Sequence, residues 1–387
     1  MTDPQCDISL AQLDRDPHPL LARARERSPV CWVPELDGWL VTGYRAAVAV
    51  LTDSATFTVD DPRFTTARVT GPSMLSRDGA EHTRHRAPFA HAFQRAELTA
   101  RLEEVTVAEA ERLAEAVRPD GQAELRETVA GPLAASVMAE ALGLAGARVS
   151  PARVLAWYRD IVAAVAALPA ARGQAQQVPV ASFGALAEGL RAAMATRKAP
   201  LLAGVAQAGT LDDGEVISNA AIVLFGGIET TEGMICNVLL HVLGHPDAPS
   251  LRGPFGIIGV DVVEESLRLE PAAAIVDRYA TRDVDFGEAR IRRGDLVTVS
   301  IAGANRDPAV FDHPDRFDAK RPNAGRHLAF ARGPHFCIGA QLARLEAVTV
   351  VNALLARLPG LRLDGSRPAQ VRGLVFRKPR TLHATWR

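Results

Sequence analysis

The sequence predicts a mainly α-helical protein with a small β portion. Long stretches carry apolar side chains at the spacing that gives a helix one buried face. The stretches that favour strands are short and fall at 31–42, 274–301 and 371–386. The 387 residues contain no internal repeat, low-complexity tract or long linker, so we expect one domain spanning residues 1–387.

The first half of the chain is expected to be helical around one β-hairpin. The apolar residues of this hairpin flank Asp37-Gly38, a dipeptide that favours a tight β-turn. Residues 53–80 are rich in Asp, Pro, Gly, Ser and Thr and are expected to be mostly loop. The segment 173–179 contains three glutamines and is interpreted as a mobile connector. Helices are expected at 20–26, 44–52, 81–93, 96–117, 125–142, 154–168 and 181–197.

The second half opens with the longest expected helix. Asp212-Asp-Gly-Glu215 has the spacing of a capping box, so a helix is expected to begin there. It is expected to run to Leu243, before Gly244-His-Pro246 ends it. Further helices are expected at 260–269, stopped by Pro271, and at 340–358, with short strands near 274–279, 290–292 and 296–301 and within 371–386.

Composition and charge argue against several classes of protein. A formal net charge of -1 gives the whole chain no electrostatic bias toward nucleic acid. Cys6, Cys31, Cys236 and Cys337 lie far apart and form no C-x-x-C pair. This spacing suggests neither a zinc site nor a disulfide framework and fits a reducing cytoplasm. The acidic N-terminus is not a signal peptide, and no run of 18 apolar residues predicts a membrane anchor.

The most informative segment is Phe330-Ala-Arg-Gly-Pro-His-Phe-Cys-Ile-Gly-Ala-Gln-Leu-Ala-Arg344. A helix that begins near Cys337 would aim unpaired N–H groups at the sulfur and favour the thiolate, which can bind haem iron. Gly333 and Gly339 carry no Cβ and would let the backbone approach a flat macrocycle. The alternative is a buried structural cysteine beside a loop, the better interpretation for a lone cysteine.

This segment resembles the haem-binding signature of the cytochromes P450, F-x-x-G-x-H-x-C-x-G-x-x-L-A-R, at every specified position. Ala331 stands where many members have Gly, so the loop is expected to be slightly stiffer. The resemblance covers nearly the whole chain. It implies the P450 fold, with haem between a long distal helix and the proximal loop and helix at Cys337. It also implies Cys337 as the metal ligand, haem b as the cofactor and O2 as the co-substrate.

The segment Ala220–Thr231 places an acid and two alcohols inside an apolar helix. Gly226 and Gly227 weaken that helix, and Thr230 can bond to a carbonyl one turn earlier, so a distorted turn is expected. The segment resembles the family's G-G-x-[DE]-T-T, which implies that Glu229 and Thr230 are catalytic residues that deliver protons for O–O scission. The alternative is a kinked helix with a solvated glutamate.

A third resemblance concerns structure rather than chemistry. Glu265-Ser-Leu-Arg268 places opposite charges one helical turn apart, which by itself is usually a weak surface pair. It resembles the family's E-x-x-R, and the resemblance adds Arg316 as a third member. The trio is expected to hold the segment that leads to the Cys337 loop.

Haem carries two carboxylates that need cationic or hydrogen-bonding partners. His82 and Arg86 lie four residues apart, on one helical face, and resemble the family's H-x-x-x-R. Arg278 matches the arginine of the strand that follows the E-x-x-R helix, and His335 lies in the cysteine loop. The resemblance implies that these four residues, with Gly339, bind the cofactor. The alternative is ordinary solvated charge.

The resemblance implies a haem-thiolate monooxygenase that hydroxylates or epoxidises a hydrophobic small molecule, for which we expect a natural-product scaffold. The family's variable recognition segments fall at 60–77, 155–185, 218–230, 272–277 and 373–376 and contain many apolar side chains. Two alternatives stay open: oxidative cyclisation or coupling without oxygen insertion, and a non-catalytic haem-binding ligand sensor. Intact Glu229 and Thr230 argue against the sensor.

The implied partners follow from the same resemblance. It implies a soluble enzyme of the actinobacterial type, expected to be cytoplasmic and monomeric, that receives electrons from a ferredoxin and its reductase. Arg326, Arg332 and Arg344 lie near the cysteine in the sequence and are candidate contacts for an acidic ferredoxin. The alternative is that these arginines are solvated charges.

Overall fold

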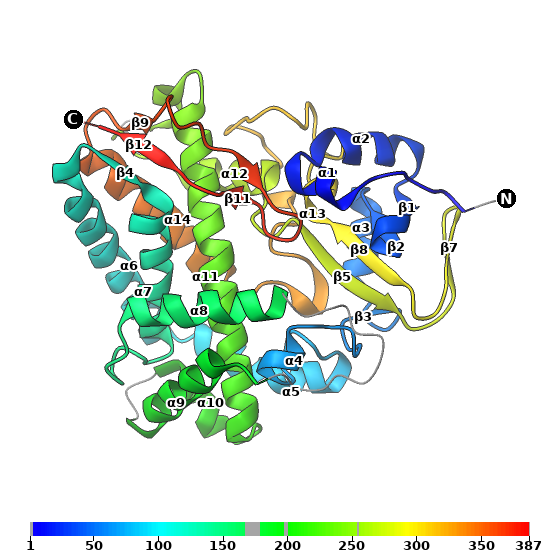
Figure 1. Cartoon of the computed structure of the whole chain (residues 1–387), viewed down its shortest axis with the longest axis horizontal. Coiled ribbons are helices and arrows are strands. Elements are labelled where there is room, and N and C mark those ends of the chain that lie inside the picture. Colours follow the sequence, from blue (N-terminus) through cyan, green and yellow to red (C-terminus); the bar gives the residue numbers. More distant parts are fainter. Residues whose placement is uncertain (1–2, 167–178, 197–199, 254, 387) are drawn as a thin grey trace.

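One long helix, α11 (Asp213–Gly244), runs through the centre of the protein, with α6, α7 and α14 on one side of it and the main sheet with α1, α2 and α3 on the other (Figure 1). The computed structural model describes residues 3–166, 179–196, 200–253 and 255–386. The connector expected at 173–179 therefore lies almost wholly outside the described residues.

The helices follow the predicted order closely. The Asp212–Glu215 capping box is present at the start of α11, as predicted. The stretch expected as one helix over 125–142 begins with a π-helical turn at Arg126–Ala130. The helices besides α11 are α1 (Leu10–Arg15), α2 (His18–Arg27), α3 (Tyr44–Thr52), α4 (Ala67–Thr70), α5 (Gly79–Phe93), α6 (Ala96–Val117), α7 (Gly131–Ala141), α8 (Pro151–Ala166), α9 (Ala181–Thr196), α10 (Pro200–Ala208), α12 (Val260–Leu269), α13 (Ile301–Ala304) and α14 (Ala340–Arg357).

The main sheet has five strands in the order β1-β2-β8-β5-β3. These are β1 (Val30–Val33), β2 (Gly38–Val41), β8 (Leu296–Ser300), β5 (Ile275–Ala280) and β3 (Phe57–Thr58). The β1–β2 hairpin is the predicted one, and Asp37 takes the left-handed conformation (φ 48°) at its turn. The β2–β8 pair is parallel and the other pairs are antiparallel. The sheet therefore joins the N-terminal hairpin to the segment after α12.

The described residues form three smaller sheets outside this one. The hairpin that matters for the site is β10 (Val371–Arg372) with β11 (Lys378–Pro379), which crosses α11 (Figure 1). The others are β4 (Gln122–Glu124) with β12 (His383–Thr385) and β9 (Arg362–Leu363), and β6 (Val284–Phe286) with β7 (Ala289–Ile291). Helices α1, α4, α10 and α13 and strands β3, β4, β6 and β9 were not predicted, because each is short and its pattern is weak.

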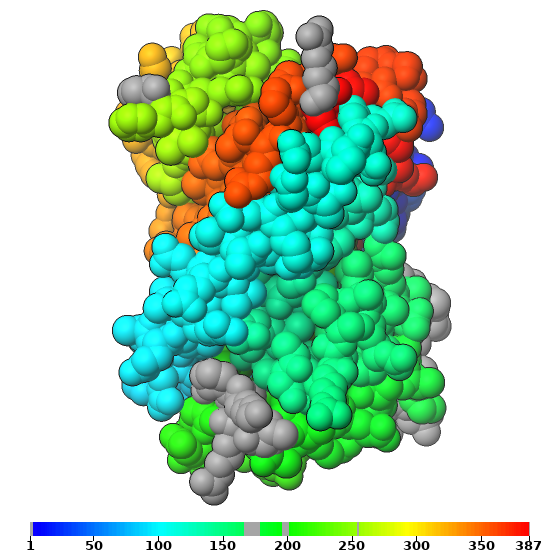
Figure 2. Space-filling view, turned by 90° about the vertical axis from the view of Figure 1, so that its left-hand side faces the viewer, coloured from blue at the N-terminus to red at the C-terminus, as the bar shows by residue number. Residues whose placement is uncertain are grey.

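The largest apolar core forms where α6, α7, α11 and α14 pack together. In Figure 2 the cyan chain that includes α6 crosses this face between the orange chain of α14 and the green helices. Helix α11 is long and apolar enough to cross a membrane by composition alone, and 72% of its most apolar window is buried within the protein. A separate core lies between the main sheet and α3.

Candidate functional site

The loop before α14 presents the sulfur of Cys337. The Cys337 N–H donates to the Phe330 carbonyl (2.9 Å), and the Phe336 N–H donates to the Gly333 carbonyl (3.1 Å). Helix α14 begins at Ala340, and the Gly339 N–H donates to the sulfur. The predicted placement of a cysteine at the start of a helix is confirmed.

Glycine has a different use at the two predicted positions. Gly333 has φ +69°, and a Cβ there would lie 2.6 Å from the Leu51 carbonyl oxygen, so this glycine serves close packing against α3. A Cβ on Gly339 would meet no described protein atom within 4 Å. The open space beside the sulfur fits a flat ligand at Gly339, whereas the predicted role for Gly333 gives way to a packing role.

The Gly339 N–H at the helix start favours the Cys337 thiolate, as expected, but burial acts in the opposite direction. Burial raises the pKa of the Cys337 thiol, and this outweighs the lowering by the Gly339 N–H, Arg86 and Arg344. Desolvation disfavours the charged form more than a few dipoles and partly distant cations favour it. A bound metal cation is the stronger influence on a coordinating thiol, because it replaces the proton outright.

Three cationic or hydrogen-bonding side chains lie near the loop with donors to spare. His82 is buried, its Nε2 has no partner among the described residues, and burial lowers its pKa to about 4. The buried Arg278 donates to the carbonyl of its own neighbour Asp277 (2.8 Å), and Arg86 donates to the Phe336 carbonyl (2.5 Å). Buried donors normally find acceptors, so this set fits an anionic group such as the carboxylates of a haem.

His335 has a protein partner that the sequence did not reveal. Its Nε2 lies 2.8 Å from Oδ1 of Asp78, the residue just before α5. Asp78 also accepts from the Thr58 hydroxyl and the Val59 N–H (2.8 Å each), and these partners together hold its pKa below the usual range despite burial. The His335 and His82 rings are 4.3 Å apart. His335 therefore lies in the predicted cluster, with one nitrogen already bonded.

Both Glu229 and Thr230 lie in α11, and Thr230 makes the predicted bond to the backbone. The Thr230 hydroxyl donates to the Gly226 carbonyl (2.5 Å), as predicted, although α11 stays helical through this turn. A Cβ on Gly226 would meet no described atom within 4 Å, so the helix faces open space there. Glu229 is held by Lys378 of β11, with Oε1 and Nζ 2.7 Å apart. No local signal in the sequence points to Lys378.

The structural trio is confirmed for two members and corrected for the third. Arg268 donates to both carboxylate oxygens of Glu265 (2.7 and 2.8 Å), and both side chains are fully buried. The third cation is Arg321, whose Nε lies 3.1 Å from each oxygen. The exposed Arg316 contributes its backbone carbonyl, which accepts from Arg268 and Arg321. Sequence proximity to the motif therefore selected the wrong arginine.

The side chains in the segments expected to face the substrate differ in exposure. Leu75, Val375 and Phe376 are exposed at 39–44% and can meet a ligand. Ile161 and Ala274 are almost fully buried and pack in the core. Of the residues expected on this side, Val165 and Phe225 are partly buried at the edge of the core.

The arginines proposed for docking are not equivalent. Arg344 is paired with Glu264 (2.5 Å) and lies over the Phe330 ring, so it is not a free surface cation. Arg326 is exposed and lies over the Tyr44 ring. Arg332 is partly buried.

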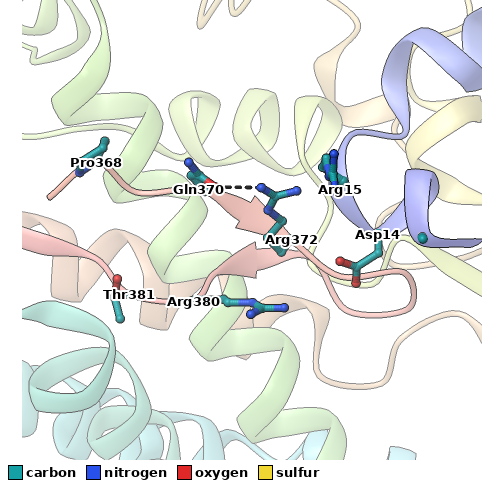
Figure 3. Close-up of a pocket in the computed structure, with 8 residues that line it drawn as sticks. Asp14, Arg15, Pro368, Gln370, Arg372, Arg380 and Thr381 are labelled. Atoms are coloured by element: carbon teal, nitrogen blue, oxygen red, sulfur yellow. Dashed lines mark hydrogen bonds between the residues drawn. The ribbon is translucent and has the colours of Figure 1, made fainter.

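A surface groove lies away from the Cys337 loop. It encloses about 790 Å³ between α1 and the β10–β11 hairpin and is lined by Asp14 and three arginines, Arg15, Arg372 and Arg380 (Figure 3). None of its lining residues belongs to the Cys337 cluster. This groove is therefore not the cofactor site.

Three comparisons with known proteins, by family model, by curated sequences and by solved structures, agree with one another. The family model described as Cytochrome P450 matches residues 260–372. Cytochrome P450 monooxygenase PikC of Streptomyces venezuelae is 36% identical over 369 residues, covering 91% of this chain and 86% of PikC. Nocardicin C N-oxygenase of Nocardia uniformis subsp. tsuyamanensis is 34% identical, covering 96% of each. The crystal structure of HmtN, a post-tailoring hydroxylase involved in himastatin biosynthesis, matches with TM-score 0.80 and 28% identity over 100% of both chains.

Proposed function

We propose that this chain, which belongs to the cytochrome P450 family, hydroxylates or epoxidises a hydrophobic natural-product scaffold. As a family member it is a monooxygenase that uses haem and O2. The natural-product class is supported by relatives that act in such pathways, nocardicin C N-oxygenase and the himastatin hydroxylase HmtN. The exposed apolar side chains of Leu75, Val375 and Phe376 support a hydrophobic substrate.

The proposed cofactor is haem b, with Cys337 as its metal ligand. When bound, haem supplies the activation of O2 that no side chain provides. The observation that carries the assignment is the Cys337 loop with open space at Gly339 and the buried His82, whose Nε2 has no partner among the described residues. We assign His82, Arg86 and Arg278 to the haem carboxylates, and His335 to the same group through its second ring nitrogen.

The proposed catalytic residues of α11 are Glu229 and Thr230. A buried reaction that consumes protons needs groups that carry them from solvent, and a carboxylate and a hydroxyl one residue apart supply two such groups. The Thr230 hydroxyl donates its hydrogen to the Gly226 carbonyl. Its oxygen is therefore free to accept a hydrogen bond from a water or another proton donor. Glu229 would take protons from the solvent side.

We further propose a cytoplasmic monomer of one domain, fed by a ferredoxin and its reductase. Arg326 and Arg332 remain the proposed contacts, since Arg344 is committed to Glu264. Weak electrostatic docking is typical of such redox encounters.

The test is the absorption spectrum of the reduced protein under carbon monoxide, compared with a Cys337→Ser variant. A strongly red-shifted Soret band in the parent, lost in the variant, is the expected result. A band at the ordinary position in the parent would show another axial ligand and overturn the role of Cys337. Given that spectrum, substrates are then screened by spin-state shift and products by mass spectrometry. Binding without any product would favour the ligand sensor.

A further inference from the structure

We propose that Lys378 is a positioning residue that holds Glu229 until a ligand reaches the β10–β11 hairpin. The inference rests on the proposed role of Glu229 in proton delivery. Lys378 Nζ lies 2.7 Å from Glu229 Oε1, and the two side chains are only 17% and 13% exposed. A partly desolvated ion pair of this kind fixes the direction of a carboxylate more firmly than a surface pair does.

The two carboxylates that Lys378 holds are not equivalent. Lys378 Nζ also lies 2.9 Å from Glu232 Oε1, and that oxygen accepts from Arg126 as well (3.0 Å). Glu232 is nearly fully buried, and a Cβ on Gly131 would come within 2.8 Å of its Oε2, so its side chain has little room to move. Glu232 is therefore the fixed end of the cluster.

Glu229 is the releasable end. Among the described contacts its only cationic partner is Lys378, whereas Lys378 keeps Glu232 if Glu229 leaves. Breaking an isolated buried pair strands a charge and is strongly unfavourable. Here the cation stays neutralised, so Glu229 can exchange Lys378 for water or another partner without leaving an unpaired ammonium. Glu229 and Glu232 raise the pKa of Lys378 against the lowering effect of burial, which keeps it charged.

Lys378 follows the tip of the β10–β11 hairpin by two residues, and we expect that tip to face the substrate. Val375 and Phe376 are exposed apolar residues at the tip, and Lys378 follows them in β11. The tip closes tightly, because Gly373 has φ +118° and a Cβ there would lie 1.9 Å from the Phe376 carbonyl oxygen. A ligand that moves the tip must break the bonds that hold it, from the Ala274 N–H to the Val375 carbonyl and from the Arg377 N–H to the Ala272 carbonyl (2.8 Å each). A ligand that displaces the tip is therefore expected to displace Lys378 with it.

The rest of the cluster leads away from Glu229 to the surface. Arg126 also pairs with Glu127, and Glu127 pairs with the half-exposed Arg159 of α8. Helix α11 packs closely on the hairpin, since a Cβ on Gly233 would lie 3.5 Å from Lys378 Cβ. Lys378 therefore lies between the fixed network of Glu232 and Arg126 and the side chain of Glu229, which must move to deliver protons.

The first experiment is a double-mutant cycle on the holoenzyme with Glu229→Gln, Lys378→Met and the pair combined. Urea unfolding is measured with and without 4-phenylimidazole, an apolar azole used as the probe. In the free protein we expect a favourable interaction free energy between Glu229 and Lys378. Expressed as an equilibrium constant, this coupling should fall by about fivefold or more when the probe is bound. No coupling in the free protein, or the same coupling with the probe, would overturn the proposal.

The second experiment measures NADH oxidation with a surrogate ferredoxin system in the absence of substrate. Lys378→Met should raise this rate by about fivefold, because Glu229 is no longer held, and Lys378→Arg should restore the low rate. The exposed Lys320→Met is the matched control and should leave it unchanged. If Glu229→Gln changes neither this rate nor the raised rate of Lys378→Met, the proposed role of Glu229 fails. If Glu229→Gln changes the rate while Lys378→Met behaves as the parent, only the present inference fails.

Discussion

At the scale of single residues, Ala331 shows how the cysteine loop stores backbone strain. It adopts φ +57°, a left-handed conformation that few residues other than glycine take readily. The prediction of a stiffer loop at this position is consistent with that geometry, because a Cβ narrows the range of conformations that the loop can visit. The strain lies six residues before Cys337, in the turn closed by the Ala331 N–H and the Leu328 carbonyl (2.8 Å).

We predict that Ala331→Gly stabilises the protein by about 0.5–1 kcal/mol, because the relief of left-handed strain exceeds the added entropy of the unfolded chain. The neighbouring Ala329→Gly is the matched control, since Ala329 has no positive φ, and it should destabilise the protein by about as much. Urea unfolding of the holoprotein measures both. Equal destabilisation by the two variants would show that Ala331 carries no strain.

At the scale of elements, the ion cluster at Glu265 ties α12 to the segment that precedes the cysteine loop. Glu265 accepts from Arg268 of its own helix and from Arg321, and also from the Asp318 N–H (2.9 Å). The guanidinium of Arg321 further donates to the carbonyls of Asp312 and His313. The cluster therefore fixes a chain segment that has little regular secondary structure of its own.

We predict that Arg321→Ala destabilises the protein by about 3–5 kcal/mol and lowers its haem content, because Glu265 loses one of two buried cations. Arg316→Ala should change stability by less than about 0.5 kcal/mol, since its contribution is a backbone carbonyl. Thermal unfolding and the haem-to-protein ratio are the measurements. Similar losses of stability and haem in both variants would show that the side chain of Arg316 also belongs to the ion cluster.

At the scale of the whole molecule, the packing of α11 against α12 makes stability depend on pH. His241 of α11 lies 2.9 Å from the Ser266 hydroxyl of α12, and burial lowers its pKa to about 4. An unfolded histidine titrates near 6.5. Between these values the unfolded chain binds a proton that the folded protein does not, so stability falls as the pH drops from about 6.5 to about 4. Above pH 6.5 this group has no such effect.

We predict that His241→Gln reduces the loss of unfolding free energy between pH 6.5 and pH 4 by roughly 2 kcal/mol, although it lowers stability at pH 7 through lost packing. His91→Gln, at an exposed position of α5, is the control and should leave the pH dependence as in the parent. Urea unfolding at a series of pH values tests this. An unchanged slope in His241→Gln would mean that other groups govern the acid sensitivity.

The sequence by itself determined the local features of this protein. Helix bounds such as those of α3, α6 and α12 follow from periodicity and stop signals within the segment, and they agree with the structure. The placement of Cys337 before a helix and the bond from Thr230 to Gly226 are also local, because each involves residues within a turn or two. Such features need no knowledge of the distant chain.

Only the tertiary structure decided which distant groups meet. Arg321 rather than Arg316 reaches Glu265, Asp78 meets His335, and Lys378 meets Glu229 across the fold. The raised pKa of Cys337 also depends on the whole fold, since its burial comes from packing that no local pattern records. Ion pairs and desolvation depend on distances in space, and the sequence fixes those distances only through the packing of the whole chain.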